Sequence, residues 1–228
     1  MVLRLMLQQL NVEGSFTCNY LLRMPTEVTA STQLVILLHG YQQTARYLYK
    51  KLERHLPPDC IVLAPCAPFP VPARNKGGYR IGFSWYFYDF SKRTYMVDMA
   101  TAIDYLQRVM KKLGLEAQPK IIVGYSQGGF LAPFLASHLA KVKQVVGIAC
   151  HIRIEELARQ EGKAFPPSYP VDAIHGDQDV IVDSKEAKKL HDEFIRQGGV
   201  GEFHLLAGSG HKLSHEMQAK VNQCLMRP

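Results

Sequence analysis

The apolar residues of the chain form short continuous runs, separated by longer stretches of mixed character. Five short, mostly apolar segments have the length and composition of strands buried in a parallel sheet. They are residues 33–38, 61–64, 120–123, 145–149 and 171–174. Helices are expected over 44–56, 93–113, 130–139, 183–197 and 214–225. The alternation of strand and helix predicts an α/β fold, with a mostly parallel sheet and helices on both faces.

Segments outside this alternation complete the expected architecture. Residues 3–12 and 16–24 read as two strands joined through a short connection, which predicts an antiparallel N-terminal hairpin. The proline- and glycine-rich residues 65–90 predict one long irregular loop of functional importance. The stretch 151–170 holds one small helix at most, so no large lid domain is expected. With no repeat or linker, residues 1–228 are interpreted as one domain.

Composition narrows the class of protein further. The chain has 228 residues and a net charge of +7, and its lysines are spread over several predicted helices. We therefore expect no nucleic-acid partner. The apolar first ten residues are too short for a signal peptide, and no apolar run reaches membrane-spanning length. Five scattered cysteines without a C-x-x-C motif indicate reduced thiols, which predicts a cytoplasmic protein without stable membrane insertion.

A candidate nucleophile lies where a predicted strand turns into a predicted helix. The sequence Gly124-Tyr125-Ser126-Gln127-Gly128 follows the strand at 120–123 and precedes the helix at 130–139. This is the context that the G-x-S-x-G nucleophile elbow requires, with small neighbours around a strained serine. The motif alone also fits a glycine-rich βα turn, so partner residues decide between the two interpretations.

Those partners follow later strands. Asp179 comes after the strand at 171–174, and His211 comes after the strand at 202–206. In an open parallel sheet both positions lie beyond the carboxyl ends of the strands, on the same side as Ser126. A serine nucleophile needs a base to take its proton and a buried acceptor to orient that base. The order Ser126, Asp179, His211 is the order found in α/β-hydrolases.

Five segments together carry a resemblance to a known family. They are Leu38-His39-Gly40-Tyr41, Trp85-Tyr86, the serine motif through Gly129, His175-Gly176-Asp177-Gln178-Asp179-Val180-Ile181-Val182, and Gly210-His211. The chain resembles the serine esterases of the α/β-hydrolase superfamily, most closely the compact carboxylesterase/acyl-protein thioesterase group and the yeast-type serine hydrolases. The resemblance implies an α/β-hydrolase fold.

The resemblance also selects among rival residues. It favours Asp179 as the acid over Asp177 and Asp183. His204 lies in a strand and His215 begins a helix, whereas His211 lies on a loop. The remaining histidines are interpreted as structural at positions 39 and 175, and as solvated at positions 138 and 191.

The resemblance places further groups around the serine. The backbone N–H groups of Gln127 and Tyr41 are expected to form an oxyanion hole. Trp85, Tyr86 and His151 correspond to positions that line the substrate pocket, although ordinary core packing explains the two aromatic residues nearly as well. No metal and no cofactor is needed.

The predicted function is hydrolysis of carboxylic ester or thioester bonds of small acyl substrates, through an acyl-enzyme intermediate. A peptidase or lactone hydrolase on the same scaffold is one alternative. A binding protein that has lost catalysis is another. The sequence leaves the oligomeric state open.

Overall fold

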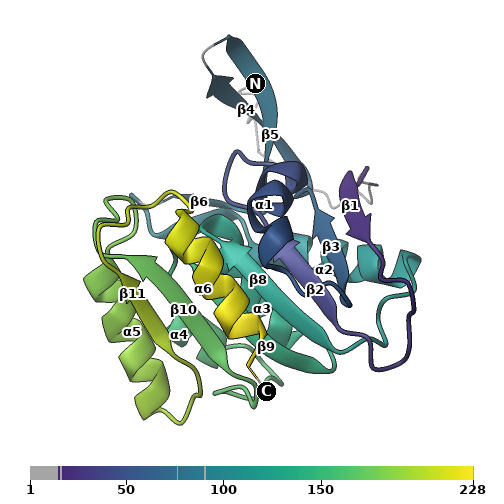
Figure 1. Ribbon diagram of the computed structural model, residues 1–228. Helices are drawn as coiled ribbons and strands as arrows, with labels where there is room; N and C mark the ends of the chain where they lie inside the picture. Colours follow the sequence, from purple (N-terminus) through teal and green to yellow (C-terminus); the bar gives the residue numbers. More distant parts are fainter. Residues whose placement is uncertain (1–14, 16, 76, 90, 228) are drawn as a thin grey trace, which may run out of the picture.

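A mostly parallel sheet forms the centre of the molecule. The computed structural model describes residues 15, 17–75, 77–89 and 91–227, and its seven-stranded sheet has the order β1-β3-β2-β8-β9-β10-β11 (Figure 1). These strands are β1 (Tyr20–Arg23), β2 (Leu34–Leu38), β3 (Ile61–Pro65), β8 (Lys120–Tyr125), β9 (Val142–Ile148), β10 (Val171–Gly176) and β11 (Phe203–Leu206). Every neighbouring pair is parallel except β1 with β3. The predicted mostly parallel sheet with an antiparallel N-terminal element is confirmed, with β1 as the antiparallel strand. The expected strand at 3–12, and with it the hairpin pairing to 16–24, lies outside the described residues.

Helices cover both faces of this sheet. They are α1 (Ala45–Leu52), the 3-10 turn η1 (Glu53–His55), α2 (Met99–Lys112), α3 (Gln127–Ser137), α4 (Ile154–Ala158), α5 (Ser184–Arg196) and α6 (His215–Leu225). One core cluster joins the sheet to α2, α3, α4 and Phe194 of α5. The other joins the opposite face to α1 and α6. Between β9 and β10 the chain holds α4 alone, as expected for a fold without a large lid.

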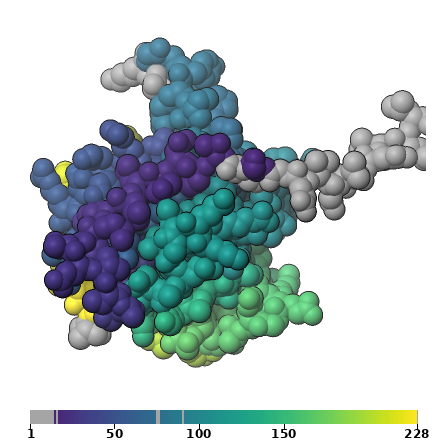
Figure 2. All heavy atoms as spheres, turned by 90° about the vertical axis from the view of Figure 1, so that its right-hand side faces the viewer, coloured from purple at the N-terminus to yellow at the C-terminus, as the bar shows by residue number. Residues whose placement is uncertain are grey.

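The long loop predicted at 65–90 is wrong, because this segment forms ordered strands. β4 (Phe69–Asn75) pairs with β5 (Gly78–Ser84), and β6 (Phe87–Asp89) pairs with β7 (Thr94–Val97). The β4–β5 ribbon projects from the body of the molecule (Figure 1 and Figure 2). Pro70 and Pro72 fit β4 because each strand of a two-stranded ribbon has one unpaired edge. Helix α2 starts at Met99, capped by Asp98, so the helix predicted from residue 93 begins six residues too early.

His191 is buried, which corrects its interpretation as a solvated residue. It lies on the inner face of α5 with Ala187 and Phe194, at the spacing of successive helical turns. Its Nε2 lies 3.1 Å from the Val171 carbonyl oxygen. A histidine can therefore occupy an inner helix face when its ring nitrogen reaches a backbone acceptor.

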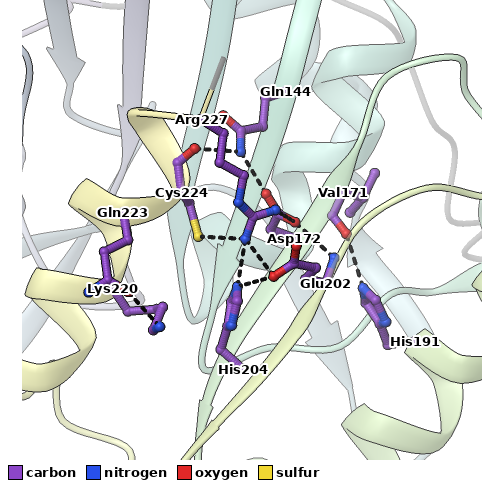
Figure 3. A network of polar contacts seen from close by, with 10 residues as sticks. All are labelled: Gln144, Val171, Asp172, His191, Glu202, His204, Lys220, Gln223, Cys224 and Arg227. Carbon is purple, nitrogen blue, oxygen red and sulfur yellow. Dashed lines mark hydrogen bonds and ion pairs between the residues drawn. The ribbon is translucent and has the colours of Figure 1, made fainter.

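A buried carboxylate ties the C-terminal segment to the sheet (Figure 3). Asp172 of β10 is fully buried and accepts hydrogen bonds from Gln144 Nε2 at 2.6 Å and from the Glu202 N–H at 2.8 Å. Arg227, which follows α6, reaches Asp172 Oδ1 at 3.1 Å and Glu202 at 2.8 Å. The guanidinium supplies the positive charge that a buried carboxylate requires.

Replacing Arg227 by methionine is expected to lower the free energy of unfolding by about 3 kcal/mol, because Asp172 then stays buried without a cation. Urea denaturation at pH 7 measures the effect. Arg196→Met is the matched control, since Arg196 pairs with Glu193 on the exposed face of α5 and should cost below about 1 kcal/mol. Equal losses in the two variants would contradict the assignment.

No helix within the described residues is both long and apolar enough to cross a membrane. All five cysteines belong to the described part of the chain and are free thiols, four of them buried.

Candidate active site

Ser126 occupies a strained turn between β8 and α3. Its backbone has φ 51° and ψ −117°, values that side-chain-bearing residues rarely adopt. The Ser126 N–H donates to the Ile148 carbonyl oxygen of β9 at 2.8 Å, which fixes the turn to the sheet. A Cβ at Gly124 would lie 2.2 Å from the Gly128 oxygen, and one at Gly128 would lie 2.1 Å from the Leu38 oxygen. Both glycines are therefore required for the strand and the helix to approach this closely.

Three side chains meet at the carboxyl edge of the sheet. His211 Nδ1 lies 2.8 Å from Asp179 Oδ2, and His211 Nε2 lies 3.0 Å from Ser126 Oγ. Asp179 follows β10 and His211 follows β11, and because these strands are parallel neighbours their following loops lie together. With the Nδ1–H donating to the carboxylate, the Nε2 lone pair is free to accept the serine hydroxyl. The structure thus brings together the three residues predicted to form the triad.

Asp179 is held as a carboxylate. Burial by itself would raise its pKa, but the N–H of Val182, the His211 ring and the N–H of Ile181 lower it below the ordinary value. The two backbone N–H groups each reach Oδ1 at 2.9 Å. Oδ1 is thereby occupied by the turn, and Oδ2 is left to face His211.

Tyr125, the residue before the serine, supports the backbone of His211. Its hydroxyl donates to the His211 carbonyl oxygen at 2.8 Å, and the two rings lie 5.7 Å apart. Burial raises the pKa of Tyr125, so its hydroxyl stays a donor at neutral pH. Sequence reasoning missed this contact, because the second position of a G-x-S-x-G motif carries no signal for a distant loop.

The rival residues are placed elsewhere. Asp177 is exposed, and Asp183 caps α5 by accepting the Glu186 N–H at 2.8 Å. His204 lies on β11 beside Arg227, as Figure 3 shows, and His215 is an exposed residue at the start of α6.

A largely aromatic cavity of about 600 Å³ opens beside Ser126. Its lining residues include Tyr41, Phe87, Tyr88, Met96, Gln127, Phe130, Ile181, Val182, Asp183 and Glu186, together with two of the predicted pocket residues, Tyr86 and His151. Trp85 is not among them: it is fully buried, and its Nε1–H donates to the His39 carbonyl oxygen at 2.8 Å. An apolar cavity next to a nucleophile suits an acyl chain or another apolar group.

The side chain of Gln127 fixes one wall of this cavity. Its Oε1 accepts the Trp85 N–H at 3.0 Å, and its Nε2 donates to the Tyr86 carbonyl oxygen at 2.8 Å and to Ser84 Oγ at 3.0 Å. The residue after the serine therefore holds the segment that carries Tyr86. The sequence analysis considered only the backbone N–H of Gln127 and missed these hydrogen bonds of its side-chain amide.

The two backbone N–H groups expected to form the oxyanion hole belong to residues that line the cavity with Ser126. Gln127 is the first residue of α3, where a backbone N–H has no acceptor within the helix. The positive end of the helix dipole also lies there. Tyr41 lies in the turn closed by the Gln43 N–H on the Gly40 oxygen, and its own N–H has no acceptor among the described residues. Both groups are available to a developing negative charge.

The loop that carries Tyr41 depends on a buried neutral histidine. His39 Nδ1 lies 2.8 Å from the Gly40 oxygen, while Nε2 accepts the Ala67 N–H at 3.0 Å, so the proton resides on Nδ1. Burial lowers the pKa of His39 to about 4, although the contact with Gly40 opposes the shift. A second proton would remove the acceptor of the Ala67 N–H.

Acid should therefore destabilise the protein through His39. Its pKa is lower in the folded than in the unfolded state, so the unfolded state binds the extra proton between pH 6.5 and about 4, and stability falls as the pH drops through this window. The contribution of His39 is about 3 kcal/mol. Urea unfolding of the wild type and of His39→Asn from pH 7 to 4.5 should show a flatter dependence in the variant. Parallel curves would contradict this role.

Comparison with known proteins agrees with this geometry. A mostly parallel sheet, a strained serine after a central strand, and an acid and a histidine after the last two strands define the α/β-hydrolase class. The chain belongs to the phospholipase/carboxylesterase family, whose model matches residues 25–226. It is accordingly a hydrolase of the phospholipase/carboxylesterase type.

Solved structures share the fold. Esterase PE8 is 26% identical with a TM-score of 0.70, covering 91% of this chain and 97% of its own. Acyl-protein thioesterase 2 of Zea mays is 19% identical with a TM-score of 0.69 and the same coverage. A carboxylesterase of Mesorhizobium loti is 19% identical with a TM-score of 0.66, covering 92% of this chain and 94% of its own. A search of curated proteins found no match.

Among the described residues, no group of three or more histidine, cysteine, aspartate or glutamate side chains is arranged to hold a metal ion.

Proposed function

We propose that this chain hydrolyses carboxylic esters or thioesters of small acyl substrates, with Ser126, His211 and Asp179 as a catalytic triad. The observation that carries the proposal is the chain of contacts from Asp179 Oδ2 through His211 to Ser126 Oγ, at 2.8 and 3.0 Å, beside an aromatic cavity. Membership of the phospholipase/carboxylesterase family supports the same bond class.

The reaction would proceed in two halves. His211 Nε2 takes the hydroxyl proton as Ser126 Oγ bonds to the acyl carbon, and the N–H groups of Tyr41 and Gln127 hold the resulting oxyanion. His211 then gives the proton to the leaving alcohol or thiol as its bond to the acyl carbon breaks. A water molecule loses a proton to His211 and attacks the acyl-enzyme, and that proton returns to Ser126 Oγ as the carboxylic acid departs. Asp179 orients the imidazole and stabilises its cation.

The site favours soluble monomeric substrates. The exposed side chains of Tyr41, Met96 and Ile181 line the cavity, and the chain holds only α4 between β9 and β10, where a lid would be inserted. We therefore propose activity without activation at a lipid interface. The five free thiols suit a reducing compartment, so we also propose a cytoplasmic location.

Hydrolysis of p-nitrophenyl esters of increasing acyl length tests the proposal, with a matched oxygen ester and thioester of the best acyl group. We expect turnover of short soluble esters below their critical micelle concentration, with a length profile set by the cavity. An absence of turnover above buffer across both series would contradict the proposed function.

A further inference from the structure

A second histidine faces the acid of the proposed triad. His175 lies near the end of β10, four residues before Asp179, and is fully buried. Its Nε2 lies 3.0 Å from the Val182 carbonyl oxygen and 3.2 Å from Asp179 Oδ2. Its Nδ1 is also buried and has no hydrogen-bond partner among the described residues.

These contacts show which ring nitrogen of His175 carries a proton. A proton on Nε2 lies between two oxygens and hydrogen-bonds to Val182, whereas a lone pair there would face both oxygens repulsively. A proton on Nδ1 would be a buried donor without an acceptor, which costs free energy. The contacts therefore place a proton on Nε2, with the positive end of that N–H bond towards the carboxylate.

His175 also closes a ring of interactions around the turn at 179–182. The Val182 carbonyl accepts from His175, while the Val182 N–H donates to Asp179 Oδ1 at 2.9 Å. The Ile181 N–H donates to the same oxygen. Ile181 and Val182 in turn line the cavity next to Ser126. The His175 imidazole thus contacts both Asp179 and Val182, the residue whose N–H holds the Asp179 carboxylate.

We propose that His175 is a positioning residue for the reaction at Ser126. Its Nε2–H holds the 179–182 turn and presents a second N–H to Asp179 Oδ2, so the carboxylate stays ionised and directed at His211. The proposal rests on the proposed hydrolase function and adds a fourth side chain to its machinery. This function differs from the purely structural interpretation of His175 drawn from its place before a glycine.

Few groups near Asp179 could supply an N–H in place of His175. The titratable groups that act on Asp179 or His175, directly or through a neighbouring ring, are His211, Tyr125, Cys150, His151, Glu186 and Lys188. Of these, His211 is the one whose nitrogen contacts Asp179 directly. Lys188 lies over Phe203, and that ring stacks on His175 with centroids 6.2 Å apart.

The test compares His175→Phe with His175→Gln. Phenylalanine keeps the stacking on Phe203 but removes the donor, whereas the glutamine amide can place an N–H near the Nε2 position. In His175→Phe we expect kcat to fall about 10- to 100-fold with KM changed less than about threefold. The acid limb of the kcat/KM profile should move up by about half a pH unit, because Asp179 with one N–H fewer attracts the imidazolium proton more strongly. His175→Gln should recover most of kcat, and the acid limb of its kcat/KM profile should lie at the wild-type pH.

His191→Phe is the matched control. His191 is likewise buried, bonds a backbone carbonyl and packs against Phe203, but none of its contacts involves Asp179. Its variant should lose stability and keep the wild-type pH profile. If His175→Phe does not fold, His175→Asn replaces it, since its amide reaches the Nδ1 position instead. The proposal would be overturned if the variant without the donor kept the wild-type kcat/KM pH profile. It would also be overturned if the variants at positions 175 and 191 changed kcat and the pH profile equally. Inactive wild type would instead refute the proposed function.

Discussion

Replacing Ser126 by alanine is expected to lower kcat for p-nitrophenyl ester hydrolysis by about a millionfold. The nucleophile is the atom that bonds to the acyl carbon, and alanine offers none in its place. The remaining activity should exceed the uncatalysed rate, because the N–H groups of Tyr41 and Gln127 and the cavity are left intact. Active-site titration of the purified variant should give no burst of p-nitrophenol.

Ser137→Ala is the control for this loss. Ser137 lies at the end of the same helix, where its hydroxyl donates to the Phe134 carbonyl oxygen at 2.7 Å, away from the cavity-lining residues. Its activity should stay within about twofold of the wild type. Retained burst kinetics in Ser126→Ala, or an equal loss in Ser137→Ala, would show that the nucleophile lies elsewhere.

Asp179→Asn is expected to lower kcat by about four powers of ten. The asparagine oxygen can still accept the N–H groups of Ile181 and Val182, so its amide nitrogen would face His211 Nδ1. The imidazole would then carry its proton on Nε2, facing the hydroxyl it has to deprotonate. The fold should persist, because Asp179 and Asn are similar in size and the turn keeps its hydrogen bonds. Stopped-flow or steady-state kinetics at pH 7 to 9 measure the change.

Asp177→Asn tests whether the loss is specific to the acid at position 179. Asp177 is exposed and lies two residues earlier in the same turn region. We expect its kinetics to match the wild type within about twofold. A large loss in Asp177→Asn with an active Asp179→Asn would reverse the assignment of the acid.

Local signals explain why much of the sheet and of the helix ends could be predicted. The strands β2 and β3 are continuous apolar runs, and β8, β9 and β10 each contain a short apolar core. Burial on both faces leaves such segments few other conformations. Thr44, Asp183 and Ser214 each cap the helix that follows them. A cap is a local contact within four residues, so it can be inferred without tertiary information.

The ribbons formed by residues 69–97 could not be inferred in the same way. Their prolines and glycines are typical of loops, and the pairing that turns them into strands depends on partners across each hairpin. The burial of His191 and Trp85 likewise depends on distant acceptors, the carbonyls of Val171 and His39. At these positions tertiary contacts, and not the intrinsic propensity of the residues, decide the conformation.

For the candidate site, the order of motifs along the chain predicts that the loops after β10 and β11 lie beside Ser126, because parallel strands place their carboxyl ends at one edge. The choice of Asp179 over Asp177 and Asp183 came from the family resemblance. The contacts that support Ser126, Asp179 and His211 could not be predicted from the sequence. The Tyr125 hydroxyl contacts the loop of His211, and the Gln127 amide contacts the segment of Tyr86, both far away in sequence. The His175 ring contacts the turn that follows its own strand, and this contact depends on how that turn folds back. Such contacts require the register of the loops, which no periodicity encodes.

Reaction with a fluorophosphonate, followed by mass mapping of the labelled peptide, tests the central claim most directly. Such a reagent is attacked by an activated serine and remains bonded to it, whatever the natural acyl group. We expect one adduct per chain, on Ser126, with labelling slowed strongly in Asp179→Asn. No adduct, or one on a different residue, would contradict the account of Ser126 as the nucleophile of a serine hydrolase.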